Sequence, residues 1–480
     1  MEQVTTPSAL LWFRRQLRLH DQPLFEVIDP DQSVCGIFIL DPREHLAEVD
    51  GTSRTGSNRM RFLLESVAEL RTALAALGVE LLIRVGHPES VLPELVDRLE
   101  VQRVHYVEEP GTEERSVERA VLSTLGDRAR PLPLDTLLEM EDPRSFAAEL
   151  PEVFSRFRRV AEKKMQLARP RAAAVTMKSV RRPGGVPLGD LPTLEELGLP
   201  AACDEPGGVL AFRGGESEGL SRMNAWIFEE DRLRRYKETR NGMLGADYSS
   251  KFSPWLATGC LSPRFVASET LRYEAERVAN DSTYWLRFEL LWREYFRLYL
   301  VKHRGTLFTP SGTQDHVMHW GNPSGHFAAW TSGTTGVPLV DANMRELAST
   351  GFMSNRGRQI VASFLSKNLD VDWRMGARWF EHCLIDYCPA ANWGNWAYAA
   401  GVGADPRGFR GFDVARQARQ YDPVGEYVAH WLPDELEGLQ GSERHEPWLH
   451  GRPRPIVSPE SSLRAARMRW DQARADSELG

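Results

Sequence analysis

Cysteine is scarce in this sequence, and nothing groups the few that occur. Five of the 480 residues are cysteine, they are widely scattered, and none stands in a Cys-x-x-Cys spacing. This pattern argues against a disulfide framework, a zinc site or an iron–sulfur cluster. We therefore expect a protein without a bound metal that works in a reducing cytoplasm.

Long apolar runs and an excess of positive charge are lacking as well. No apolar stretch approaches the roughly 20 residues that cross a bilayer, and the first residues do not resemble a signal peptide, so we expect no membrane partner. The net charge of −8 by itself argues against nucleic acid, because a phosphate-binding surface must gather Lys and Arg. Local basic stretches remain, and their simplest interpretation is a solvated helix face. They lie over 345–378 and at Arg407, Arg410, Arg416 and Arg419.

The first third of the chain has no G-x-G-x-x-G and no Walker-type loop, so a dinucleotide or ATP site there is unsupported. It does alternate short apolar runs with a helical pattern over 60–77 that stops at Gly78. The runs predict buried strands over 10–13, 34–40, 80–85 and 103–107. This order implies a doubly wound parallel sheet, with ligands at the carboxyl ends of its strands.

A chain of this length exceeds what one core usually supports, so we expect two domains. Residues 135–215 are rich in Pro and Gly, which predicts a long surface connection. From there to Trp431 the pattern is helical almost throughout, and an Arg-rich stretch over 461–475 predicts one short helix. The predicted fold class is α/β plus all-α: a doubly wound parallel-sheet domain over 1–134, a linker over 135–215, a helical domain over 216–432 and a tail over 433–480.

Three segments of the helical half group polar and aromatic residues. Over 288–296, Glu289, Trp292 and Arg293 share a helix face and suit a planar polar ligand, although a helix at a domain seam with an internal ion pair explains this segment alone more simply. Over 350–359, burying Arg358 requires a carboxylate, and Asp386 is the candidate; a purely structural pair is the simpler interpretation. Over 391–403, aromatics alternate with amides and glycines, which makes a slot for a flat ring.

Together with Tyr236 and residues 248–256, these segments resemble the flavin-binding half of photolyases and cryptochromes. The resemblance runs in matching order from Trp12-Phe13-Arg14 to about Trp448. Four further stretches, 150–158, 212–215, 355–359 and 421–423, are similar to the DASH-type branch of the family. The resemblance implies a helical domain that binds FAD and an N-terminal domain with an antenna pigment, in this branch a folate, methenyltetrahydrofolate.

The resemblance also implies which residues bind the cofactors. Those that match pyrophosphate-binding positions are Tyr236, Ser249, Ser250, Lys251, Phe252 and Ser253. Those that match positions around the flavin ring are Glu289, Arg293, Asn355, Arg358, Asp386 and Asn392, the last facing the ring nitrogen that changes protonation on reduction. Glu65 matches the carboxylate that binds the antenna's pterin, although an exposed acid on an amphipathic helix is nearly as good an interpretation. The family's usual Asp-x-Asp reads Asp386-Tyr387-Cys388 here, and the lost carboxylate predicts weaker FAD binding or a shifted potential.

Catalytic and DNA-binding residues follow from the same resemblance. Trp396, Trp373 and Trp320 match a chain that carries electrons from the surface to the flavin, and Glu289 matches the acid that hydrogen-bonds the damaged pyrimidine pair. The implied DNA contacts are Trp292, Tyr398, Gln359, Arg356 and Arg410. Tyr398 and Gln359 replace the Trp and Met of duplex-repairing photolyases, so the lesion clamp is smaller. Flipping a dinucleotide out of a duplex costs a few kcal/mol, whereas stacking recovers roughly 1–3 kcal/mol per base, so single-stranded or looped DNA should be preferred.

The function we expect is blue-light-driven, FAD-dependent repair of cyclobutane pyrimidine dimers in such DNA by a monomeric photo-lyase. The alternative is a blue-light photoreceptor that signals through flavin photoreduction without repair. The retained lesion-pocket residues favour the enzyme, and the absence of a long C-terminal extension counts against a signalling cryptochrome. A dark redox flavoprotein is a weaker third alternative, because no nicotinamide motif is present.

Overall fold

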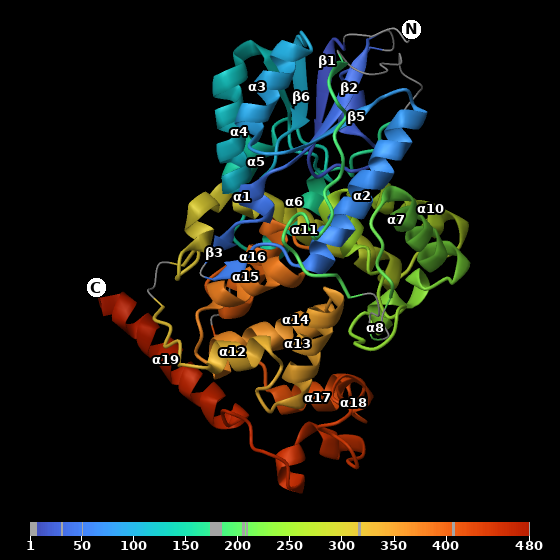
Figure 1. Cartoon of the computed structure of the whole chain (residues 1–480). Helices are drawn as coiled ribbons and strands as arrows, with labels where there is room; N and C mark the ends of the chain where they lie inside the picture. Colours follow the sequence, from blue (N-terminus) through green and yellow to red (C-terminus); the bar gives the residue numbers. More distant parts are fainter. Residues whose placement is uncertain are drawn as a thin grey trace.

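The computed structural model describes residues 7–29, 32–49, 51–172, 185–203, 207, 210–314, 318–405 and 409–479. Arg407 and residues 173–184 of the predicted linker lie outside this set. The N-terminal part of the chain forms a sheet with helices on both sides, and helices build the rest (Figure 1).

Five parallel strands form the sheet, in the order β5-β2-β1-β6-β7. They are β1 (Ala9–Phe13), β2 (Val34–Leu40), β5 (Leu81–Val85), β6 (Arg103–Val107) and β7 (Ala129–Leu132). The four predicted strands are confirmed to within one residue. The strand β7 was missed because Arg130 and Pro131 are exposed on this edge strand, where a proline is tolerated and no apolar run is needed. The strand order reverses at β1, which places a crevice at the carboxyl ends of β1 and its neighbours.

Side chains alternate along the strands and feed two separate cores. Leu11, Phe13 and Phe38 face α2 (Ser57–Ala76) and the helical half, while Leu10 and Ile37 face α3 (Pro88–Arg98) and α4 (Thr112–Leu125). The helix predicted over 60–77 is confirmed as α2. After β2 the chain adds α1 (Pro42–His45) and a hairpin of β3 (Glu48–Val49) and β4 (Thr52–Ser53).

The predicted surface connection is wrong in its first part. It contains α5 (Pro143–Ala148) and α6 (Phe154–Lys164), and both pack on α11 (Asp281–His303). Leu150, Phe154 and Phe157 are buried there. These apolar residues lie between polar ones, so the Pro- and Gly-rich composition concealed a packed segment. The boundaries at 134, 215 and 432 remain predictions.

Helix α11 packs against α8, α10 and α16 of the helical half. The start of α11 is fixed by a capping box between Asn280 and Thr283. The other helices are α7 (Glu216–Asn224), α8 (Tyr236–Thr239), α9 (Ser253–Thr258), α10 (Pro263–Glu276), α12 (His326–Thr331), α13 (Pro338–Thr350), α14 (Asn355–Ser363), α15 (Trp373–Cys383), α16 (Pro389–Ala400), α17 (Val414–Tyr421), α18 (Glu426–Trp431) and α19 (Pro459–Leu479). The helix predicted over 461–475 is confirmed as the longer α19, which crosses the outside of the helical half (Figure 1). Among the described residues, no helix is long and apolar enough to cross a membrane.

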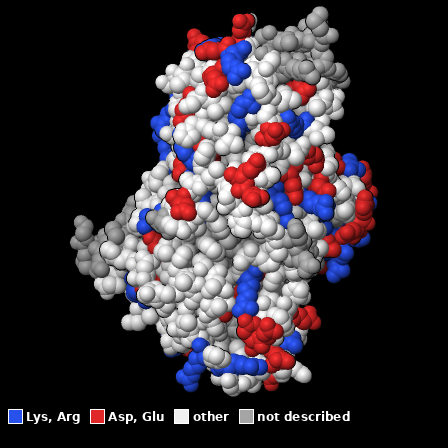
Figure 2. All heavy atoms as spheres, in the orientation of Figure 1, with Lys and Arg blue, Asp and Glu red and all other residues white. Residues whose placement is uncertain are grey.

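Three of the six Lys and Arg residues over 345–378 pair with carboxylates. Arg345 pairs with Glu435, Arg358 with Asp386 and Arg374 with Asp372. On the face shown in Figure 2, basic and acidic side chains are interspersed, and a broad uncharged area covers part of the helical half. Net basic composition in this stretch is therefore no sign of an open basic surface.

Candidate functional site

Arg358 and Asp386 form a two-pronged ion pair inside the helical half. Arg358 donates from Nη1 to Asp386 Oδ1 at 3.0 Å and from Nη2 to Oδ2 at 2.7 Å, and its Nε donates to Met353 O at 2.9 Å. The Asp386 side chain is only 2% exposed. The predicted contact is confirmed, and it fixes a guanidinium plane between α14 and the segment before α16. Asn355, the first residue of α14, is exposed.

Asn392 lies on α16 with its amide oriented by the neighbouring helix. Its Nδ2 donates to Ala377 O on α15 at 2.9 Å, and the residue is buried. Within the described chain no group donates to its Oδ1, so one polar atom of a fixed amide is left for a ligand.

A loop before α9 carries the predicted pyrophosphate-binding serines. Arg222 on α7 holds this loop by donating from Nε to Ser250 O at 3.1 Å and from Nη2 to Ala246 O at 3.0 Å. Sequence reasoning missed Arg222, because only the folded loop brings these carbonyls to it. Phe252 and Tyr236 are buried beside the loop.

Lys251 in this loop is a buried cation without a hydrogen-bond partner among the described residues. Its Nζ lies 3.9 Å from the ring centre of Tyr248 and 4.7 Å from that of Phe352. Burial lowers the pKa of Lys251 to about 7. An amine buried without an acceptor is costly, and a bound anion would offset that cost.

These groups fit the FAD that the resemblance implies. The ion pair and the oriented amide offer polar partners for a flat ring, and Lys251 and the serine loop offer donors to a pyrophosphate. Arg293 extends the set, donating from Nη2 to Leu256 O at 3.2 Å.

Of the three tryptophans predicted to carry electrons, Trp373 and Trp320 are linked through one backbone carbonyl. Trp396 and Trp373 are buried and Trp320 is half-buried. Trp373 and Trp320 both donate from Nε1 to Pro310 O, at 3.1 and 3.3 Å. The ring of Trp396 packs on α15 over Gly376, where a Cβ would lie 2.3 Å from the ring. Trp320, the predicted outer ring, is the most exposed of the three, whereas Trp373 and Trp396 are both buried, so exposure does not order these two and their order remains a prediction.

Glu289 on α11 is held by two donors. Arg240 Nη2 lies 2.6 Å from its Oε1, and the Trp285 indole donates to the same oxygen at 3.1 Å. Burial raises the pKa of Glu289, although Arg240 and the indole act in the opposite direction. The sequence alone did not point to Arg240, because this residue ends a short helix, α8, whose local sequence has no distinctive motif.

The predicted DNA contacts converge beside Glu289. The rings of Trp292 and Tyr398 meet edge to face with centroids 6.0 Å apart, and Arg410 donates to the Tyr398 hydroxyl at 2.9 Å. Arg356 donates to Gln359 at 3.0 Å. Burial and the neighbouring charges of Arg240 and Arg410 lower the pKa of Arg356, so three cations share this face.

One face of the Trp292 ring is already covered. Phe154 from the linker stacks on it at 3.6 Å between centroids with an interplanar angle of 13°. A base could use only what remains of the indole, so Trp292 is less open than the wall that the resemblance implies.

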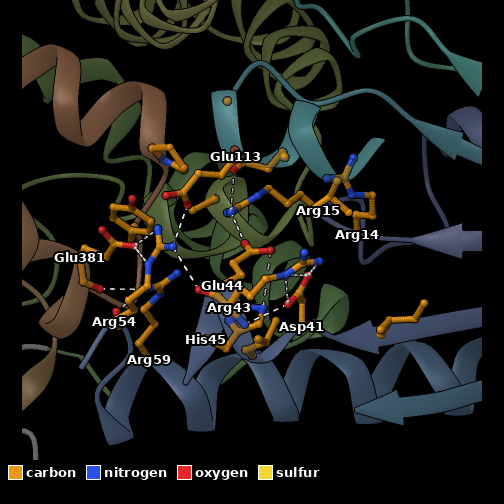
Figure 3. Close-up of a pocket in the computed structure, with 18 of the residues that line it drawn as sticks. Arg14, Arg15, Asp41, Arg43, Glu44, His45, Arg54, Arg59, Glu113 and Glu381 are labelled. Carbon is orange, nitrogen blue, oxygen red and sulfur yellow. Dashed lines mark hydrogen bonds and ion pairs between the residues drawn. The ribbon is translucent and has the colours of Figure 1, made fainter. Parts of the chain in front are cut away.

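A separate cavity of about 680 Å³ lies between the two halves of the chain (Figure 3). It opens at the carboxyl ends of β1 and β2, where the reversal of strand order places a crevice. Its volume is that of a small-molecule site. Its lining includes Arg14, Arg15, Asp41, Arg43, Glu44 and His45 from the sheet side, Arg54 and Arg59, Glu113 from α4, and Glu381 and Tyr387 from the helical half.

The charges around this cavity are mutually paired. Arg54 lies 2.7 Å from Glu113 and 2.8 Å from Glu381. Arg15 pairs with both Glu44, at 2.5 Å, and Glu114, at 3.4 Å. Burial works against ionisation of Glu44, yet Arg15 lowers its pKa to about 2, whereas burial and the charge of Glu44 raise the pKa of Glu114 to about 7. A polar ligand could therefore replace some of these ion pairs by its own contacts with the charged side chains of the wall.

Glu65 lies outside this cavity. Its carboxylate accepts a hydrogen bond from Gly214 N at 2.7 Å and is not part of the lining. Cys388 lies in a small neighbouring cavity with Arg15, Arg293 and Arg297. The thiol therefore stands among guanidinium groups.

Known proteins resemble the chain over most of its length. Residues 285–471 match the model of the FAD binding domain of DNA photolyase and residues 9–176 that of DNA photolyase. Cryptochrome DASH from Gloeobacter violaceus is 49% identical over 93% of this chain and 89% of its own length, and that from Synechocystis is 47% identical over 92% and 91%.

Solved structures of other proteins also superpose on most of the chain. The Synechocystis sp. PCC6803 cryptochrome superposes with a TM-score of 0.90 at 43% identity, covering 98% of this chain and 100% of its own. An archaeal photolyase from Sulfolobus tokodaii, described as holding two FAD molecules with a novel light-harvesting cofactor implied, gives 0.76 at 25% identity over 97% and 99%.

Proposed function

Because the chain belongs to the photolyase and cryptochrome family and is most like its DASH-type members, we propose that it repairs cyclobutane pyrimidine dimers in blue light and prefers single-stranded DNA. FAD in the helical half supplies the light absorption and the electron. The observation that carries the proposal is the convergence of Glu289, the Trp292–Tyr398 pair and three arginines on one face.

Burial shifts the acid at this face toward its neutral form. Burial raises the pKa of Glu289, so its neutral form is more accessible than that of an ordinary glutamate. A neutral carboxyl donates a hydrogen bond to a pyrimidine carbonyl and stabilises negative charge that develops there. Arg240, paired with Glu289, holds the carboxyl in place.

The preference for single strands follows from the small stacking area. Phe154 covers one face of Trp292, and Tyr398 offers a phenol, tied to Arg410, in place of an indole. Such a clamp recovers little of the few kcal/mol that extrusion from a duplex costs. A dimer that is already unpaired avoids that cost, while Arg356 and Arg410 contact the flanking phosphates.

We also propose an antenna pigment, and the interdomain cavity is the space for it. The archaeal relative described as holding two FAD molecules supports a second chromophore site in this fold, and the folate remains our candidate. Loading methenyltetrahydrofolate onto the full chain and following its near-ultraviolet absorbance tests this. Thr52→Trp, which fills the cavity lining, should abolish loading, whereas loss only in Glu65→Gln would locate the pterin at Glu65 instead.

The deciding experiment supplies reduced protein with dimer-containing oligonucleotides and measures the light-dependent return of intact thymine absorbance. Repair that fails in Glu289→Gln supports the proposal. If blue light reduced the flavin through Trp396, Trp373 and Trp320 but repaired neither single-stranded nor duplex oligonucleotides, the result would favour the alternative function, a photoreceptor. For both functions we propose a monomeric, cytoplasmic protein.

A further inference from the structure

The ammonium group of Lys367 lies in an aromatic cage beside the outermost tryptophan. Lys367 belongs to the π-helical turn Phe364–Asn368 that continues α14, and it is 2% exposed. Its Nζ lies 5.0 Å from the ring centre of Trp470, 5.4 Å from that of Phe409 and 5.9 Å from that of Trp320. No carboxylate in the described part of the chain forms an ion pair with it. The aromatic rings favour the charged form of this ammonium, whereas burial and the charge of Arg469 lower the pKa of Lys367 to about 7, so the group carries its positive charge below that pH.

The ammonium is fixed at the end of the helix that carries Asn392 and Trp396. It donates a hydrogen bond to the carbonyl of Ala400, the last residue of α16, where a cation also interacts favourably with the helix dipole. Gly401 follows with φ of 83°, and a Cβ there would lie 2.9 Å from the Trp470 ring. The close approach of Trp470 therefore requires a glycine at this turn.

The C-terminal helix α19 closes the cage. Besides Trp470 it contributes Arg469, which lies 3.2 Å from Asp370 and donates to Lys367 O at 3.5 Å. Asp370 therefore neutralises Arg469 and not Lys367. Asp370 O also accepts from the backbone of Asn322, two residues after Trp320, at 2.8 Å, so α19, Lys367 and the loop of Trp320 form one connected unit.

We propose that Lys367 is a positioning residue of the electron relay formed by Trp396, Trp373 and Trp320. Lys367 acts through Trp320, because its charge makes Trp320 harder to oxidise. Helix α19 holds Lys367 beside Trp320 through Trp470. This rests on the relay in the proposed function. The step concerned removes one electron from the Trp320 indole, to refill Trp373, and leaves a radical cation. An external thiol returns one electron to the indole, becomes a thiyl radical and releases its proton to water; otherwise the Nε1 proton of the radical cation passes to water and a neutral indole radical remains.

Charge supplies the physical reason. Below about pH 7 the charged ammonium, 5.9 Å from the ring centre, repels the positive charge that Trp320 acquires, and this repulsion is strong where water is excluded. The same cation attracts the electrons of the neutral ring. A hole at Trp320 is therefore higher in energy and is refilled faster by a thiol, which keeps damage away from the half-exposed indole.

The test oxidises the full-length, FAD-containing protein in the dark at pH 6, where Lys367 carries its charge. A ruthenium(III) polypyridine complex takes one electron per event and becomes ruthenium(II), dissolved O₂ in the air-saturated buffer adds to the indole radical, and peptide mass spectrometry measures oxygen-modified Trp320. Lys367→Gln and Lys367→Met should raise Trp320 modification roughly tenfold. Lys367→Arg, which keeps the charge, should match the parent, and Trp470→Ala should fall between because the ammonium can turn to water.

Equal modification in Lys367→Met and the parent would overturn the proposal. So would equal increases in Lys367→Arg and Lys367→Met, because these would indicate loosened packing and not charge. Near-ultraviolet circular dichroism selects the variants that keep the fold, and Lys367→Met, which preserves the stem, replaces Lys367→Gln if the latter unfolds. The chemical oxidant acts without light, so this test does not depend on photoreduction. If the parent protein failed to photoreduce its flavin, the proposed relay would be excluded, but the effect of Lys367 on the oxidation of Trp320 could still be measured.

Discussion

The indole nitrogens of Trp373 and Trp320 donate hydrogen bonds to the same oxygen, that of Pro310, at 3.1 and 3.3 Å. One carbonyl therefore fixes a buried ring and a half-buried ring relative to each other. This shared acceptor gives the proposed relay a rigid step between the interior and the surface, and electron transfer depends steeply on such geometry.

Removing the middle ring should break the relay without disturbing FAD binding. We expect Trp373→Phe to nearly abolish photoreduction of bound FAD by thiol, because the ring between Trp396 and Trp320 is lost. The measurement is bleaching of the flavin absorbance in blue light. Phe327, which lies off this path, provides the control: Phe327→Leu should bleach at the parent rate, and a Trp373→Phe variant that also did so would exclude this route.

Breaking the buried ion pair should cost stability and FAD together. Asp386→Asn leaves Arg358 without its counter-ion, and loss of one partner of a buried pair costs about 3 kcal/mol. We expect a lower free energy of unfolding in urea and weaker FAD retention on gel filtration. Arg374→Gln, which removes the more exposed pair with Asp372, should cost less than about 1 kcal/mol. Similar losses in both variants would contradict a special role for Asp386.

Much of the N-terminal fold could be predicted because buried parallel strands are continuous apolar runs. Val34–Leu40 is buried at every position, and its bounds were predicted without error. The packed part of the linker could not be predicted in the same way, since Leu150, Phe154 and Phe157 are isolated apolar residues whose burial depends on α11. Composition records how many apolar residues a segment has, but not which partner covers them.

Residues of the candidate site could be predicted where they belong to a local sequence motif. They were not identified where the contact forms only between segments that are distant in the sequence. Arg358 could be matched with Asp386 because a buried guanidinium requires a carboxylate. Arg240, Arg222 and Lys367 stand in unremarkable local patterns, and their contacts with Glu289, Ser250 and Trp320 exist only after folding. The roles of all these residues in catalysis and binding remain predictions.

A larger clamp should reduce the preference for single strands. Tyr398→Trp adds stacking area, and about 1 kcal/mol of extra stacking corresponds to roughly fivefold in affinity. We expect duplex repair to gain by that factor and single-strand repair to change less. Tyr398→Phe, which removes only the hydroxyl bonded to Arg410, is the matched control and should not gain. A Tyr398→Trp variant with an unchanged ratio of the two substrates would show that this ring does not set the preference.

Restoring the family's carboxylate should tighten FAD binding. Cys388 lies beside Arg293 and Arg297, so Cys388→Asp adds a charge-assisted contact that holds Arg293, which the resemblance places at the flavin ring. We expect the affinity for FAD to rise by at most roughly tenfold, the full value of such a contact of about 1.5 kcal/mol. The measurement is the dissociation constant of FAD added to stripped protein, followed by flavin fluorescence. Cys388→Ser should leave it nearly unchanged. Weaker binding in Cys388→Asp would mean that the thiol is preferred at this position.

Glu346 should make stability fall as pH rises. It is fully buried, its Oε2 accepts from the Tyr427 hydroxyl at 2.7 Å, and burial raises its pKa to about 7. The folded state therefore holds this proton more tightly than the unfolded state does, so the contribution is complete below about pH 4.3 and is lost as pH rises through 7. Glu346→Gln stays neutral and should gain thermal stability relative to the parent between pH 5 and pH 7. A constant difference between the two melting temperatures would contradict this assignment.

The most direct measurement of the central claim compares repair rates for one dimer in three settings: a single strand, a bubble within a duplex, and a fully paired duplex. Each is mixed with reduced protein and illuminated at the same photon flux, and thymine recovery is followed with time. The account predicts fast repair of the single strand and the bubble, much slower repair of the duplex, and none in the dark. Equal rates on all three, or no light-dependent recovery on any, would contradict it.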